Sequence, residues 1–175
     1  MNLVEYELHV RSLAAKSDGT PLYNESVEHA AIVIENLFAH ADDSVDILSG
    51  FCNARVFGRA TVVEEAQLFL ATASTNKLRI ILEKNLPEDR TIHPFFQMCA
   101  TMPNVELRIA PEKLQERYGF HFIVADKRNY RYEDDKTQPA AIAAFGNRTG
   151  AENLTEIYEY LWPHCTPADT IAETC

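Results

Sequence analysis

Basic side chains concentrate in one short part of an otherwise acidic chain. Arg117, Lys127, Arg128 and Arg131 lie close together in the sequence, and Arg148 could join them through a later turn. Clustered cations attract anions such as phosphate, or an acidic protein partner. A solvated hairpin surface would have the same composition, so both interpretations stay open. Arg128, Arg131 and Arg148 are candidate ligand-binding residues.

The same stretch contains two further residues that could do chemistry, His121 and Asp126. A histidine can act as a nucleophile or as a proton donor. Each residue also has a structural interpretation. His121 could be a strand histidine that is hydrogen-bonded to a neighbour, and Asp126 precedes Lys127-Arg128-Asn129, where aspartate commonly stabilises a turn.

Composition limits the classes of function. The formal net charge is −10 over 175 residues, which disfavours broad binding to nucleic acid, although a local basic cluster leaves it open. The six histidines show no metal-ligand spacing, and the four cysteines form no CxxC pair. We therefore expect no metal, no cofactor and reduced thiols. No apolar run is long enough to span a membrane and no signal peptide is evident, so we expect a cytoplasmic protein.

The hydrophobic pattern alternates between helical and strand periods. Helical spacing is expected after Asn24 or Ser26, after Thr61, over 93–102 and after Thr149; strands are expected over 44–50, 77–83, 105–109 and 140–145, with a hairpin over 120–133. The loop 51–59 is a candidate site wall. This order predicts a single α/β domain with a mixed, mostly parallel sheet flanked by helices. We expect an N-terminal appendage over 1–23, the domain over 24–163 and a C-terminal tail over 164–175.

The element order and two local motifs resemble the phospholipase D-like superfamily. The motifs are GFHFIVADKRNYRYE, which starts at Gly119, and AAFGNRTGAENLTEIYEYLW, which starts at Ala143. In that family a histidine, a lysine two residues later and an aspartate form the signature, and a glycine-serine turn with an asparagine follows. The resemblance implies a histidine nucleophile, a lysine that neutralises phosphate and a supporting aspartate.

Neither alignment of the signature is complete. With Asp126 as the family's aspartate, Gly119 stands at the histidine position and His121 at the lysine position. With His121 as the nucleophile, Ile123 and Arg128 stand at the lysine and aspartate positions. In both cases part of the catalytic set is missing.

The later motif also departs from the family pattern. Asn147 follows Gly146 where a serine is usual, and Thr149 stands where the asparagine is expected. The resemblance thus implies a degenerate member with one motif per chain. His121 and Asp126 are its candidate catalytic residues, and Asn147 joins the candidate ligand-binding residues.

The first hypothesis is a non-catalytic domain that acts as a regulatory, scaffolding or phosphorylated-ligand-binding subunit. It would contact another protein, form a homodimer and serve as an accessory factor of a bacterial defence or mobile-element system. The second hypothesis is a homodimeric, metal-independent phosphodiesterase or nuclease that uses His121 across the dimer axis, with arginines in place of the lysine. A third, an acidic mimic of nucleic acid, rests on the net charge alone.

Overall fold

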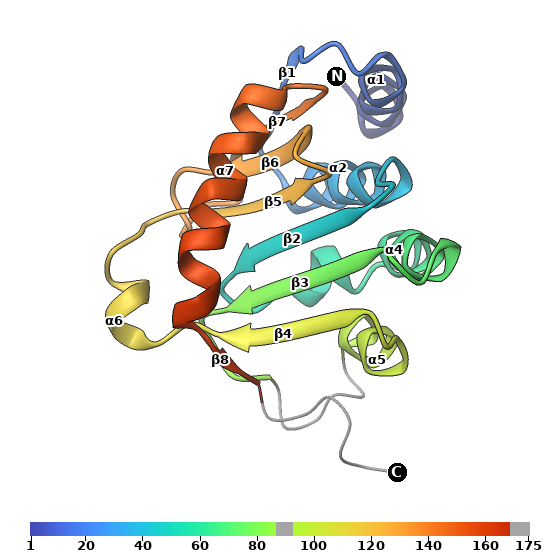
Figure 1. The fold of residues 1–175 in the computed structure, drawn as a ribbon. Helices are drawn as coiled ribbons and strands as arrows, with labels where there is room; N and C mark the ends of the chain where they lie inside the picture. The colour runs from blue at the N-terminus through green and yellow to red at the C-terminus, as the bar shows by residue number, and fades with distance from the viewer. Residues whose placement is uncertain (87–92, 169–175) are drawn as a thin grey trace.

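The apolar segments of the chain pair into one mixed sheet. The computed structural model describes residues 1–86 and 93–168, and its sheet has the strand order β1-β7-β6-β5-β2-β3-β4-β8 (Figure 1). The strands are β1 (Pro21–Asn24), β2 (Ser44–Ser49), β3 (Lys77–Leu82), β4 (Val105–Ile109), β5 (His121–Ala125), β6 (Asn129–Glu133), β7 (Ala141–Phe145) and β8 (Thr166–Pro167).

Parallel pairing is limited to β2, β3 and β4, while the pairs on either side of these strands are antiparallel. The predicted mixed sheet flanked by helices is confirmed, but the parallel part is narrower than the mostly parallel sheet that was expected. The hairpin accounts for one of the antiparallel pairs, because a tight turn joins β5 to β6 and only antiparallel strands can be connected in this way.

Helices cover both faces of the sheet. They are α1 (Leu3–Lys16), α2 (Val27–Ala39), α3 (Ala54–Phe57), α4 (Ala60–Thr72), α5 (Pro94–Thr101), α6 (Glu112–Gln115) and α7 (Arg148–Leu161), followed by the 3-10 turn η2 (Trp162–His164). No helix among the described residues has both the length and the apolar character needed to cross a bilayer.

Alternation along the strands divides the core into two layers. Val45 and Ile47 of β2 pack with residues of α1, α2, α4 and α5, whereas Leu48 packs with residues of α7 on the other face. Figure 1 shows α7 lying across one face of the sheet, with α2, α4 and α5 on the opposite side. Each side chain on β5 and β6 therefore projects from the sheet either toward α2 or toward α7.

Helix α1 and the short strand β8 both take part in the fold. Tyr6, Val10 and Leu13 of α1 are buried in the core, and the Tyr6 hydroxyl donates to the carbonyl oxygen of Tyr23 at 3.2 Å. The segment 1–23, expected as an appendage, thus contributes to the main core. The expected tail 164–175 begins with β8, which pairs with β4; the rest of the tail beyond residue 168 lies outside the described residues.

The N-cap of the last helix lies two residues before the predicted one. Asn147, rather than Thr149, is the N-cap residue of α7, and its side-chain oxygen accepts a hydrogen bond from the Gly150 amide at 3.0 Å. Gly146 directly before it has φ of 87°. The Gly146-Asn147 turn is therefore a helix start.

Candidate functional site

A cavity of about 350 Å³ opens on the α2 side of the sheet, where β2 and β6 end and β5 begins. Apolar side chains from α2 and from the segment after β2 form one wall, and polar side chains from β5, β6 and the following loop form the other. The lining residues are Val27, Ala30, Ile34, Ser49, Gly50, Phe51, Asn53, Val56, Phe57, His121, Arg131, Glu133, Lys136, Thr137, Gln138 and Pro139. The loop predicted as a site wall contributes Phe51, Asn53, Val56 and Phe57.

Strand register brings three polar side chains of the hairpin together. His121 at the start of β5 lies opposite Glu133 at the end of β6, and Arg131 lies opposite Ile123. Because side chains two residues apart share a face, His121, Arg131 and Glu133 all project to the α2 side.

His121 is held between two carboxylates. Its Nδ1 lies 3.6 Å from Oε2 of Glu133, and its Nε2 lies 3.4 Å from Oε1 of Glu83, which directly follows β3. The histidine side chain is only 12% exposed. Burial by itself lowers the pKa of His121, but the contacts with Glu133 and Glu83 outweigh it and raise the pKa above the ordinary value. The imidazole is therefore stabilised in its protonated form.

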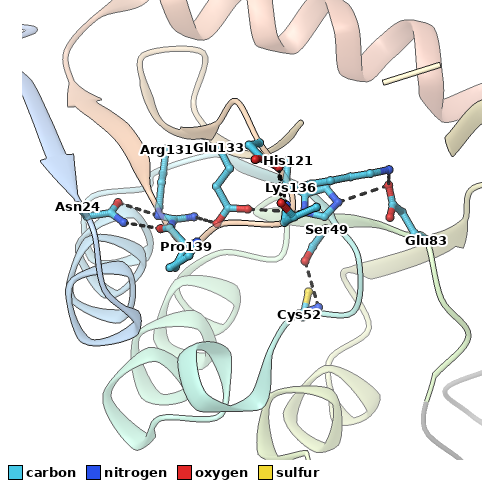
Figure 2. A network of polar contacts seen from close by, with 11 residues as sticks. Asn24, Ser49, Cys52, Glu83, His121, Arg131, Glu133, Lys136 and Pro139 are labelled. Atoms are coloured by element: carbon cyan, nitrogen blue, oxygen red, sulfur yellow. Dashed lines mark hydrogen bonds and ion pairs between the residues drawn. The ribbon is translucent and has the colours of Figure 1, made fainter. Parts of the chain in front are cut away.

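Arg131 is fixed inside the protein (Figure 2). Its Nε donates to the side-chain oxygen of Asn24 at 3.0 Å, its Nη2 donates to the carbonyl of Pro139 at 3.0 Å, and its Nη1 pairs with Glu133. The residue is 4% exposed. Its guanidinium therefore neutralises Glu133 and anchors the loop that contains Pro139.

Lys136 is a site residue that the sequence analysis missed. Its Nζ lies 2.8 Å from Oε1 of Glu83, donates to the carbonyl of Gln115 at 3.3 Å, and sits 5.2 Å from the ring centre of Tyr118. Figure 2 shows Lys136 and Glu83 beside His121. In the sequence, the only sign of a role for Lys136 is that it is the single lysine in the acidic run after β6.

The two carboxylates keep their charge despite partial burial. Burial raises the pKa of each group, but His121 and Lys136 together hold the pKa of Glu83 below its usual value, and His121 and Arg131 do the same for Glu133. The site is thus a chain of alternating charges, from Arg131 through Glu133, His121 and Glu83 to Lys136.

Gly50 packs beside the histidine ring. A Cβ atom at Gly50 would lie 3.4 Å from Cε1 and 3.9 Å from Nε2 of His121, both ordinary van der Waals distances.

Asp126 and Arg128 lie beyond the other end of β5 from His121. The Asp126 carboxylate accepts hydrogen bonds from the backbone amides of Asp42, Asp43 and Ser44 at 2.8, 2.9 and 2.9 Å. Arg128 donates to the carboxylate of Asp42 at 2.9 Å. These contacts fasten the hairpin turn to the segment that leads into β2.

Asn147 and Arg148 lie where β7 passes into α7. Asn147 caps the helix and its side-chain amide lies 3.4 Å from the Tyr130 hydroxyl, while Arg148 is exposed. The structure thus separates the candidate residues into two groups. His121 and Arg131 belong to the cavity. The others lie at the opposite end of the strands; they are Asp126, Arg128, Asn147 and Arg148. In the part of the chain that the structure describes, no group of three His, Cys, Asp or Glu side chains could hold a metal ion.

This geometry can be compared with known families. A profile of the family described as a domain of unknown function (DUF7931) matches residues 26–172. The chain belongs to this family. No curated protein matches the sequence.

Solved structures share the fold of this DUF7931 member at low sequence identity. Nuc from Salmonella typhimurium, a phospholipase D family member, has a TM-score of 0.64 and 12% identity over 87% of this chain and 100% of its own. NucT from Helicobacter pylori has a TM-score of 0.60 and 9% identity over 86% of this chain and 99% of its own. The archaeal chromatin protein TrmBL2 has a TM-score of 0.60 and 11% identity over 93% of this chain and 60% of its own. The predicted phospholipase D-like fold is thereby confirmed.

Proposed function

We propose that this phospholipase D-like domain is a non-catalytic binding subunit with a regulatory or scaffolding role. The observation that carries the proposal is the internal pairing of the cavity. His121 faces Glu83 and Glu133, and the neighbouring cations Arg131 and Lys136 contact the same two carboxylates.

Such pairing is unfavourable for phosphodiester hydrolysis. A histidine nucleophile needs an unprotonated nitrogen directed at phosphorus, whereas both nitrogens of His121 face carboxylates and its pKa is raised. A transition state with extra negative charge needs donors that are not already neutralised. Arg131 and Lys136 do not meet that condition, because each contacts a glutamate.

The fold neighbours are compatible with a binding role. TrmBL2 is described as a chromatin protein with a novel mode of DNA binding. For the present chain the net charge of −10 favours a protein partner over DNA. Association with a second copy and with another protein, in the cytoplasm and as an accessory factor of a bacterial defence or mobile-element system, is part of the same proposal. Light scattering after size-exclusion chromatography tests the homodimer, and a monomer at all concentrations would contradict it.

The decisive experiment is an assay of bis(4-nitrophenyl) phosphate and of single- and double-stranded DNA with wild type, His121→Ala and His9→Ala. His9 is an exposed residue of α1 and serves as the matched control. We expect no turnover above the buffer rate in any of the three proteins. Turnover that is lost in His121→Ala and kept in His9→Ala would overturn the proposal and establish a phosphodiesterase that depends on His121.

A further inference from the structure

A second, smaller pocket lies at the corner formed by α6, the end of α7 and η2. Its volume is about 260 Å³, and its lining residues are Pro111, Lys113, Leu114, Arg117, Tyr160 and His164. It shares no lining residue with the cavity at His121. Anything bound here would therefore occupy a separate site.

The pocket gathers basic groups that are not neutralised. Within the described residues, Lys113, Arg117 and His164 form no ion pair, whereas Arg79, Arg131 and Lys136 each contact a carboxylate. Glu112 and Glu116 are close in sequence but do not line the pocket. In a chain with a net charge of −10, such a local excess of positive charge runs against the average field. It favours an anionic ligand.

The pocket also presents aromatic and apolar surface. Tyr160 is 62% exposed, and its ring centre lies 5.4 Å from that of His164 with an angle of 58° between the ring planes. Leu114 is buried and, with Pro111, supplies the apolar part of the lining. An exposed tyrosine beside unpaired cations can stack a planar ring while the cations bind the attached anion.

We propose that the pocket at Lys113, Arg117 and Tyr160 binds a nucleotide. Arg117 and Lys113 contact the phosphate, and the base stacks on the ring of Tyr160. The volume of about 260 Å³ lies just below the range of about 300–1,000 Å³ that is usual for ligand sites, which limits the ligand to about one nucleotide unit. A free mononucleotide and the terminal unit of a single strand both have this chemistry.

Calorimetric titration of the full chain at low ionic strength with AMP, adenosine and a 5′-phosphorylated oligothymidine tests the proposal. We expect AMP to bind at least about tenfold more tightly than adenosine, equivalent to about 1.4 kcal/mol, because adenosine lacks the phosphate. Lys113→Ala and Arg117→Ala should each weaken AMP binding about tenfold. Tyr160→Ala should weaken AMP binding by a similar factor.

Matched controls separate this site from general charge effects and from the larger cavity. Lys77→Ala removes an exposed cation elsewhere, since Lys77 begins β3 at the end of the parallel strands opposite to Pro111. We expect Lys77→Ala and His121→Ala to bind AMP as wild type does. AMP binding with no binding of the oligonucleotide would identify the free nucleotide as the ligand, and the reverse would identify the strand.

Three results would overturn the proposal. The first is the absence of binding by both phosphorylated probes. The second is an equal loss in Lys77→Ala and Lys113→Ala, which would indicate nonspecific attraction. The third is a loss in His121→Ala with unchanged binding in Arg117→Ala, which would place the ligand in the cavity at His121.

Discussion

Asp126 provides the sharpest test of a structural role for a candidate catalytic residue. Its carboxylate accepts three backbone hydrogen bonds, one from the partly buried Ser44 amide and two from the exposed amides of Asp42 and Asp43. Hydrogen bonds to a charged group contribute about 1.5–3 kcal/mol, and the two exposed amides can bind water in a variant, so the loss is roughly 3 kcal/mol. Asp126 also has φ of 52°, where alanine adds about 1 kcal/mol.

We therefore expect Asp126→Ala to lower the free energy of unfolding by about 4 kcal/mol. Asp126→Asn, which tolerates the left-handed conformation and keeps one acceptor oxygen, should lower it by about 2 kcal/mol. Urea denaturation measures both. With a slope of about 2 kcal/mol per molar urea, the midpoint should fall by about 2 M for the alanine variant with the slope unchanged.

Asp42→Ala is the control. The Asp42 carboxylate is 80% exposed and pairs with Arg128 at 2.9 Å, so its removal should cost less than about 1 kcal/mol. A loss below about 1 kcal/mol for Asp126→Ala would refute the reasoning. It would show that water satisfies all three amides and that the carboxylate does not fasten the hairpin to β2.

Four other variants test the turn before α7, the Arg79–Asp46 ion pair and the cavity. Gly146→Ala should lower the midpoint of thermal unfolding, because φ is 87° and a Cβ would clash with the Ser17 carbonyl oxygen; an unchanged midpoint would contradict this reasoning. Arg79→Met removes the guanidinium that pairs with Asp46 at 2.7 Å and should cost about 3–5 kcal/mol in urea unfolding, since it leaves a buried carboxylate unpaired. Adding Asp46→Leu should recover most of that loss. His121→Gln should change the pH dependence of stability. The folded pKa of His121 is raised, so its contribution is full below pH of about 6.5 and is lost as the pH rises through the folded value; a stability difference between wild type and His121→Gln that does not vary with pH would disprove it.

Local pattern was sufficient for most elements of the fold. The β-branched run at 44–50, the apolar run at 77–83 and the alternation at 105–109 correspond to β2, β3 and β4. The hairpin over 120–133 forms β5 and β6. These segments were predictable because side-chain period and turn residues are local properties. Helix α1 was not predicted, although its buried stripe of Tyr6, Val10 and Leu13 has helical spacing.

The cavity could be predicted only in part. His121 and Arg131 were identified, and their common face follows from strand parity. Glu83 and Lys136 were missed, because they are far apart in sequence. They meet only because β3 and β6 both end on the same side of the folded sheet. No local pattern encodes such a contact.

The α/β class and the hairpin could be predicted from the sequence, because both depend on residue types at short spacing. Which charged side chains meet became known only from the folded chain. It placed two carboxylates on His121 and a carboxylate on each neighbouring cation. It also showed that the Asp126 carboxylate, at the other end of β5, accepts hydrogen bonds from backbone amides. The protonation and pairing of a histidine depend on groups within a few ångströms in space, and strand order sets those neighbours.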